Sequence, residues 1–125
     1  MRVTIQLEPE QGNLRYVRRI AQTWMDAIGA SWDALPLVTT ELVSNALAAS
    51  PPDRRVEVRL EASGAELAVS VLDAGSGLKS RHFSPPPATS VRGRGLAIVD
   101  SLADRLTIDR QDGCTLVTAR KLATS

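Results

Sequence analysis

The chain has 125 residues, a length typical of one domain with a single hydrophobic core. Hydrophobic residues make up 43% and charged residues 23% of the chain, which excludes a disordered or low-complexity protein. The net charge of +1 gives no indication of a nucleic-acid or membrane partner. One cysteine and one histidine exclude an internal disulfide and a zinc site made of these residue types alone. Because no apolar signal core or membrane-length apolar run is present, we expect a cytoplasmic protein.

The first half of the chain predicts one strand and two helices. Residues 3–7 alternate between apolar and polar, as in a half-buried strand. In residues 14–28 the apolar side chains recur at helical spacing, and Gly29 is a suitable end for that helix. A second helix is expected after Asp33, which suits an N-cap, and should end at Ala49 before two prolines.

The second half predicts four strands, at residues 56–60, 67–72, 106–110 and 115–122, and one helix, at residues 96–103. Residues 62–65 suit a hairpin turn. The stretch 73–94 has no periodicity, and a loop of this length in a small domain is usually a functional lid or disordered. This order of elements predicts an α+β fold, a two-layer sandwich with helices on one face of a mixed, mostly antiparallel sheet.

The first motif lies on the second predicted helix, where Glu41 and Asn45 are about one turn apart on one face. An Asn side-chain oxygen suits Mg²⁺, which keeps several waters and shares phosphate oxygens. A carboxylate one turn away can position or deprotonate a nucleophile. A solvated polar pair is the alternative interpretation, because this spacing is common on amphipathic helices.

The second motif, DAGSG at residues 73–77, follows a predicted strand directly. A carboxylate at the end of a buried strand is costly unless it is hydrogen-bonded. Since an ionised carboxylate only accepts hydrogen bonds, Asp73 could recognise the amino group of adenine directly or through water. Gly75 and Gly77 let the backbone turn tightly beside a ligand, although a plain turn explains them equally well.

The third motif places Gly93, Arg94, Gly95 and Leu96 at the start of the third predicted helix. Glycines at this point leave amide donors and the positive helix end accessible to a phosphate, and Arg94 adds positive charge. A flexible loop with a glycine helix start is the alternative. The motif is neither a Walker loop, since no Gly-Lys-Ser/Thr follows, nor a dinucleotide fingerprint, since it does not follow the first strand of a βαβ unit.

In order and context, the three motifs resemble the N, G1 and G2 boxes of the ATPase superfamily that includes gyrase, heat-shock chaperone, histidine kinase and mismatch-repair ATPase domains. The sequences ELVSNA, DAGSG and GRGLAIVDSLADR are most similar to those of stand-alone bacterial anti-sigma-factor serine/threonine kinases. The resemblance covers nearly the whole chain. It implies one Bergerat-type ATP-binding domain over residues 1–125, a lid at about 78–94, and ATP and Mg²⁺ as cofactors.

The resemblance also implies roles for single residues. Asp73 would contact adenine, Asn45 would bind Mg²⁺, and Glu41 would act as a base toward a protein hydroxyl or water. Thr115 resembles a Gly-Thr element near the nucleotide, although an ordinary β-branched strand residue is an equal explanation. The other nucleotide-binding residues implied are Gly75, Gly77, Gly93, Arg94, Gly95 and Leu96.

As a function, the resemblance implies an ATP-dependent kinase that binds a sigma factor and phosphorylates an antagonist protein, and it suggests a homodimer. Direct contact with nucleic acid or membrane is not implied. Family members usually carry a basic or polar pair soon after the Asn, where this chain has Ala48 and Ala49. Prolines 85–87 stiffen the expected lid. Both features leave open a non-catalytic nucleotide-binding module that regulates a partner by binding alone.

Three arginines, Arg15, Arg18 and Arg19, lie on the polar side of the first predicted helix. A solvated helix face is the simplest interpretation of this cluster. In the family that the chain resembles, the corresponding region often contacts a partner protein, so an interface is the alternative.

Overall fold

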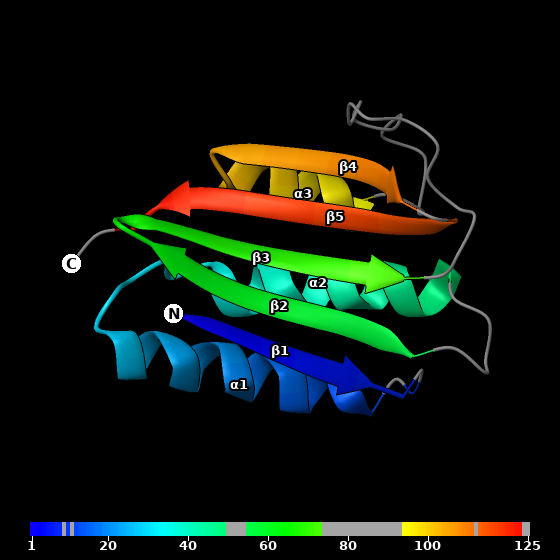
Figure 1. Cartoon of the computed structure of the whole chain (residues 1–125), viewed down its shortest axis with the longest axis horizontal. Helices are drawn as coiled ribbons and strands as arrows, with labels where there is room; N and C mark the ends of the chain where they lie inside the picture. The colour runs from blue at the N-terminus through cyan, green and yellow to red at the C-terminus, as the bar shows by residue number, and fades with distance from the viewer. Residues whose placement is uncertain (9, 11, 50–54, 74–93, 112, 124–125) are drawn as a thin grey trace.

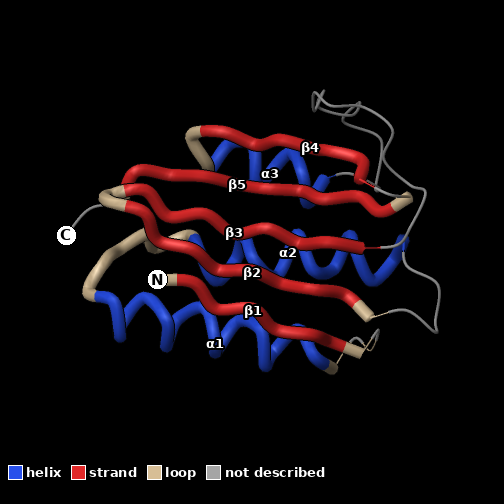
Figure 2. Tube along the Cα trace, in the orientation of Figure 1, coloured by secondary structure: helices blue, strands red, loops and turns tan. Residues whose placement is uncertain are grey.

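An antiparallel sheet with helices on one of its faces forms the part of the chain that the structure describes (Figures 1 and 2). This structure, a computed structural model, describes residues 1–8, 10, 12–49, 55–73, 94–111 and 113–123. The elements in chain order are β1 (Arg2–Leu7), α1 (Asn13–Ile28), α2 (Leu35–Ala49), β2 (Val56–Ser63), β3 (Glu66–Asp73), α3 (Arg94–Leu102), β4 (Arg105–Gln111) and β5 (Cys114–Leu122).

The strands follow the order β1-β2-β3-β5-β4, and every pairing among the described residues is antiparallel. In β2, the fully buried Val56, Val58 and Leu60 alternate with half-buried Glu57 and Arg59. Successive side chains of a strand point to opposite faces, so this alternation places one face against the helices. The expected two-layer α+β arrangement with a largely antiparallel sheet is confirmed.

The helix ends show one confirmed prediction and one correction. Gly29 adopts a left-handed conformation with φ of 69°, and its amide donates to the Met25 carbonyl at 3.0 Å, which ends α1 as expected. Asp33 is not the N-cap of α2, because the helix begins two residues later, at Leu35. Instead, the Asp33 carboxylate accepts a hydrogen bond from the Ser31 hydroxyl at 3.1 Å, within the turn that precedes the helix.

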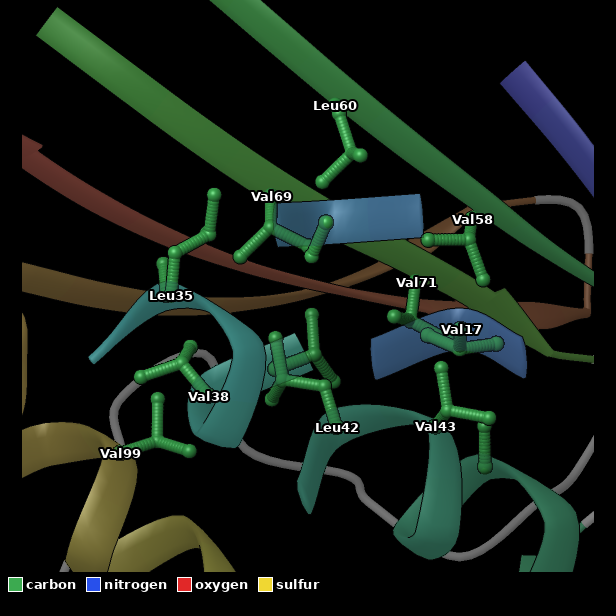
Figure 3. Packing of buried hydrophobic residues seen from close by; sticks show 14 of the residues in the cluster. Val17, Leu35, Val38, Leu42, Val43, Val58, Leu60, Val69, Val71 and Val99 are labelled. Carbon is green, nitrogen blue, oxygen red and sulfur yellow. The ribbon is translucent and has the colours of Figure 1, made fainter. Parts of the chain in front are cut away.

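The hydrophobic core lies between the inner face of the sheet and the three helices (Figure 3). Figure 3 shows Leu60 and Val69 of the sheet pointing toward side chains of the helices, among them Val17 of α1, Leu42 of α2 and Val99 of α3. Each such side chain stabilises the fold by about 1.5–3 kcal/mol through its removal from water. Since all three helices contribute, burial fixes their positions relative to the sheet.

Several sequence expectations depend on residues outside the described part of the chain. The predicted lid at 78–94 lies outside it except for Arg94, as do Gly75, Gly77 and Gly93. Helix α3 begins at Arg94, two residues earlier than its apolar pattern indicates. Among the helices that the structure describes, none is long and apolar enough to cross a membrane.

Four element ends meet at one end of the sheet, on the right in Figure 1. Strand β3 ends there, strand β5 and helix α3 begin there, and helix α2 runs toward it. Helix α2 packs against both α3 and β3. The elements that carry the sequence motifs therefore converge, and we name this region the site end.

Candidate functional site

At the site end, α2 lies close to the first turn of α3. A Cβ atom added at Gly95 would lie 2.5 Å from Oε2 of Glu41 and 3.6 Å from Nδ2 of Asn45. Glu41 and Asn45 are both half-buried and face the same neighbouring helix. The sequence placed the pair on one helix face, and the structure shows that this face is directed at α3 rather than at open solvent.

Helix α3 is held in place by its own core contacts. Leu96 and Val99 are 3% and 0% exposed, so the helix cannot move away from α2 without losing buried apolar surface. The first turn of an α-helix carries amide groups without intrahelical partners, and its end is electropositive. The carboxylate of Glu41 therefore lies beside the positive end of α3, where an anion is favoured.

The side-chain amide of Asn45 is incompletely hydrogen-bonded. Its Nδ2 atom is buried and has no hydrogen-bond partner among the described residues. A buried donor without a partner costs about 1–3 kcal/mol, and folded proteins rarely leave one without a reason. The observation marks this point as one where a ligand atom could complete the hydrogen bonding.

A second polar group lies at the same end of the sheet, across strands β3, β5 and β4. Asp73 is 5% exposed and pairs with Thr115, which is 1% exposed, in the ladder between β3 and β5. The side chain of Arg110 donates to Oγ1 of Thr115 at 3.3 Å. An acidic, a hydroxyl and a basic side chain are thus brought together where the strands leave the core.

Four of the predicted site residues have described side chains that lie at the site end. They form two sets. Glu41 and Asn45 form one set with the backbone of Gly95, and Asp73 and Thr115 form the other. Leu96 lies in the hydrophobic core, and its predicted part in nucleotide binding stays a prediction. Arg94 opens α3, but its side chain lies outside the described part, as do Gly75, Gly77 and Gly93.

Arg110 is a site neighbour that the motifs did not indicate. It pairs with Thr115 across the hairpin that joins β4 to β5, and Gly113 in that turn has φ of 80°. A hairpin pairs residues symmetrically about its turn, so counting outward from the expected turn could have found this partner.

On α1, a groove of about 390 Å³ is lined by Arg15, Arg18, Arg19, Gln22, Thr23 and Pro36, and we name it the basic groove. All three arginines are exposed, and none forms an ion pair with a described residue. The groove lies on the solvent side of α1, opposite the buried Val17 and Ala21. The three arginines therefore line a concave surface, which supports the alternative interpretation that this helix face contacts a partner protein.

Within the described residues, no group of three or more His, Cys, Asp or Glu side chains could hold a metal ion. A Mg²⁺ ion does not require such a group, because it is commonly held by one or two protein oxygens together with water and phosphate.

The chain matches the family described as histidine kinase-like ATPase domain over residues 6–121. No curated protein matches it.

Two solved structures share the fold. One contains the RsbU and RsbW domains of Rv1364c from Mycobacterium tuberculosis, with a TM-score of 0.71 and 21% identity. That match covers 100% of this chain but 33% of the other, so this chain spans a third of that protein's length. The other is the catalytic domain of the histidine kinase ThkA, with a TM-score of 0.63 and 13% identity, covering 96% of this chain and 97% of that one.

The family match spans nearly all of the chain, and the five-stranded sheet with helices on one face is shared with both structures. The chain therefore belongs to the histidine kinase-like ATPase domain family.

Proposed function

We propose that this chain binds Mg-ATP at the site end and acts as a serine/threonine protein kinase of the anti-sigma type. The single observation that carries the proposal is the contact between α2 and α3. There, Glu41 and the buried amide nitrogen of Asn45, which has no partner among the described residues, both face the first turn of α3 at Gly95. Family membership supports the nucleotide, and the retained carboxylate supports catalysis.

The residues at this contact suit a magnesium nucleotide. A side-chain amide has a donor and an acceptor, so Nδ2 of Asn45 suits a phosphate oxygen while its Oδ1 suits Mg²⁺. The electropositive start of α3 favours a phosphate group. At the neighbouring set, the buried carboxylate of Asp73 is an acceptor suited to the amino group of adenine.

In this proposal ATP would supply its γ-phosphoryl group to the substrate hydroxyl and leave as ADP, and Mg²⁺ would offset the negative charge. Glu41 accepts the proton from the attacking hydroxyl of the protein substrate, as a general base does. Asn45 orients the cofactor, and Asp73 selects the base. Gly75, Gly77, Gly93, Arg94 and Thr115 complete the proposed binding site.

The proposed partners are a sigma factor, which the protein sequesters, and an antagonist, which it phosphorylates. The three motifs that resemble anti-sigma-factor kinases are the support for this form of regulation. A cytoplasmic location and a homodimer belong to the same proposal.

Titration calorimetry with Mg-ATP tests the binding step. We expect the wild-type chain to bind and Asp73→Asn to bind at least about tenfold more weakly, because the amide lacks the negative charge and one of the two acceptor oxygens of the carboxylate. Equal affinity of the two proteins would remove the adenine assignment. Absence of binding by either protein would contradict the nucleotide site as a whole.

Phosphoryl transfer from labelled ATP to a cognate antagonist tests the catalytic step. We expect Glu41→Ala to bind ATP and to transfer at least about 100-fold more slowly, since a general base contributes about that much. If wild-type protein binds ATP and phosphorylates no antagonist, the kinase proposal fails and the nucleotide site stands.

A second candidate function, regulation by binding alone, is favoured by the basic groove. Ala48 and Ala49 are exposed near the end of α2 and offer no polar group to a phosphate. The groove, in contrast, offers three guanidinium groups that match carboxylates well. If this function is correct, Arg18→Glu releases the partner protein while Glu41→Ala holds it as the wild type does; the opposite pattern in a pull-down with the cognate partner excludes it.

A further inference from the structure

Gly95 is a glycine in a position where backbone geometry does not require one. The glycines with left-handed backbone in the described residues are Gly29, Gly64 and Gly113, whereas Gly95 lies within the first turn of α3. Inside a helix, glycine is less favourable than alanine, because it loses more backbone freedom on folding. Some feature other than the backbone conformation must therefore account for its presence.

The nearest atoms to Gly95 supply that feature. An added Cβ would meet Oε2 of Glu41 at 2.5 Å and Cδ of Glu41 at 3.5 Å, and the first distance is a collision. Its distance to Nδ2 of Asn45 would be 3.6 Å, an ordinary van der Waals contact. The collision thus involves one group, the carboxylate of Glu41.

The carboxylate is also the group that would move if a methyl group were added at residue 95. It is the far end of a flexible side chain, whereas α3 is fixed by Leu96 and Val99 in the core. A methyl group at residue 95 would therefore displace the carboxylate and leave the helix where it is. The fold can accept alanine at residue 95, but the Glu41 carboxylate cannot then keep its position.

We infer that Gly95 is a positioning residue for Glu41: its missing side chain leaves the space in which the Glu41 carboxylate lies beside the first turn of α3. The inference rests on the proposed function, because Glu41 is the proposed base. It deepens that function, because Gly95 then serves to position the base and not to bind the phosphates. A displacement of about 1 Å at a reacting group lowers a rate by about 100-fold.

The variants Gly95→Ala, Glu41→Asp and the combination of both, compared with the wild type, test the inference. Aspartate is shorter by one methylene and withdraws the carboxylate from the added methyl group. Gly12→Ala is the matched control, because Gly12 has helical backbone angles and no atom of the described residues lies within 4 Å of its added Cβ.

Nuclear magnetic resonance of the nucleotide-free proteins is the first readout. In Gly95→Ala, we expect the side-chain signals of Glu41 to shift, with a melting temperature equal to or above that of the wild type. The shift should be absent from Gly12→Ala. Unchanged Glu41 signals in a folded Gly95→Ala protein would overturn the inference, and this readout holds whether or not the chain proves to be a kinase.

Phosphoryl transfer and ATP affinity are the second readout. We expect Gly95→Ala to lower kcat by about 100-fold and to change the dissociation constant of ATP by about threefold or less. The double variant should recover to the rate of Glu41→Asp alone. If Gly95→Ala instead weakens ATP binding by more than about tenfold and Glu41→Asp brings no recovery, the glycine serves the phosphates and the inference is wrong.

Discussion

The two ends of the sheet differ in how fully their polar groups are hydrogen-bonded. At the end where both chain termini lie, on the left in Figure 1, described backbone groups are paired across the turns. The Ala123 amide donates to the Ala65 carbonyl at 2.6 Å, and the Ala62 amide donates to the Met1 carbonyl at 2.8 Å. We name this region the closed end. At the site end, by contrast, the amide nitrogen of Asn45 is buried without a described partner.

Asp104 is an example of a well-paired polar residue at the closed end. Its carboxylate accepts hydrogen bonds from the Leu122 amide at 2.8 Å and from Lys121 at 3.3 Å, and its own amide donates to the Arg120 carbonyl at 2.8 Å. One residue between α3 and β4 thus ties both to the last strand. The contrast is one of degree, because the buried Nε1 atoms of Trp24 and Trp32 also lack a partner among the described residues. What distinguishes Asn45 is its place beside Glu41 and the first turn of α3.

The largest expected effect comes from the core that supports both ends. Leu42 is fully buried on α2, the helix that carries Glu41 and Asn45. We expect Leu42→Ala to lower the free energy of unfolding by about 2–5 kcal/mol, because it removes buried apolar surface and leaves a cavity. Urea unfolding measures this, with the exposed Leu37→Ala on the same helix as control, for which we expect about 1 kcal/mol or less. Equal losses would contradict the burial of Leu42.

The next prediction tests whether the site end gives up stability for function. Asn45→Leu replaces a buried donor without a described partner by an apolar side chain of similar size. We expect the free energy of unfolding to rise by about 1 kcal/mol, since the unpaired polar group at this position is removed. ATP binding should be lost in calorimetry. A clear loss of stability would mean that the amide is satisfied in the nucleotide-free protein and would remove the contrast between the two ends.

A smaller, pH-dependent effect is expected at the closed end. The hydrogen bond from the Leu122 amide, followed by that from Lys121, lowers the pKa of Asp104 below its ordinary value of 3.8. A carboxylate whose folded pKa is lowered stabilises the protein above its unfolded pKa, and this contribution is lost as pH falls through the folded pKa.

Asp104→Asn should therefore reduce stability at neutral pH and flatten its decline as the pH falls below about 4. Chemical unfolding of both proteins across that range measures the difference. A parallel decline in the two proteins would show that Asp104 takes no part in the acid sensitivity of the closed end.

The smallest effect is expected from the surface ion pairs of the outer sheet face. Arg2 and Glu61 form one such pair between β1 and β2, with side chains that are 63% and 40% exposed. We expect Glu61→Gln to change the free energy of unfolding by about 0.5 kcal/mol or less, because water screens exposed charges. The difference should vanish at about 1 M salt. A larger, salt-resistant loss would mean that ion pairs, and not backbone pairing, stabilise this end.

Local pattern predicted most of the elements because each depends on neighbouring residues. The left-handed Gly29 at the end of α1 and the Gly64 turn between β2 and β3 needed only the residues around them. The start of α3 was predicted two residues late, because Arg94 and Gly95 interrupt the apolar pattern without interrupting the helix. The N-cap at Asp33 was wrong because α2 begins only at Leu35, and Asp33 belongs to the preceding turn, where its carboxylate accepts from Ser31.

The sequence by itself determined the chemistry of the site: a carboxylate and an amide one helical turn apart, an acid after a strand, and glycines before a helix. Tertiary structure alone decided that Thr115 lies opposite Asp73, and that the missing side chain of Gly95 faces Glu41. The physical reason is that strand register and helix packing set such contacts, through buried side chains far apart in the chain. Spacing in sequence can place two residues on one face of a helix, but only the packed core decides what that face meets.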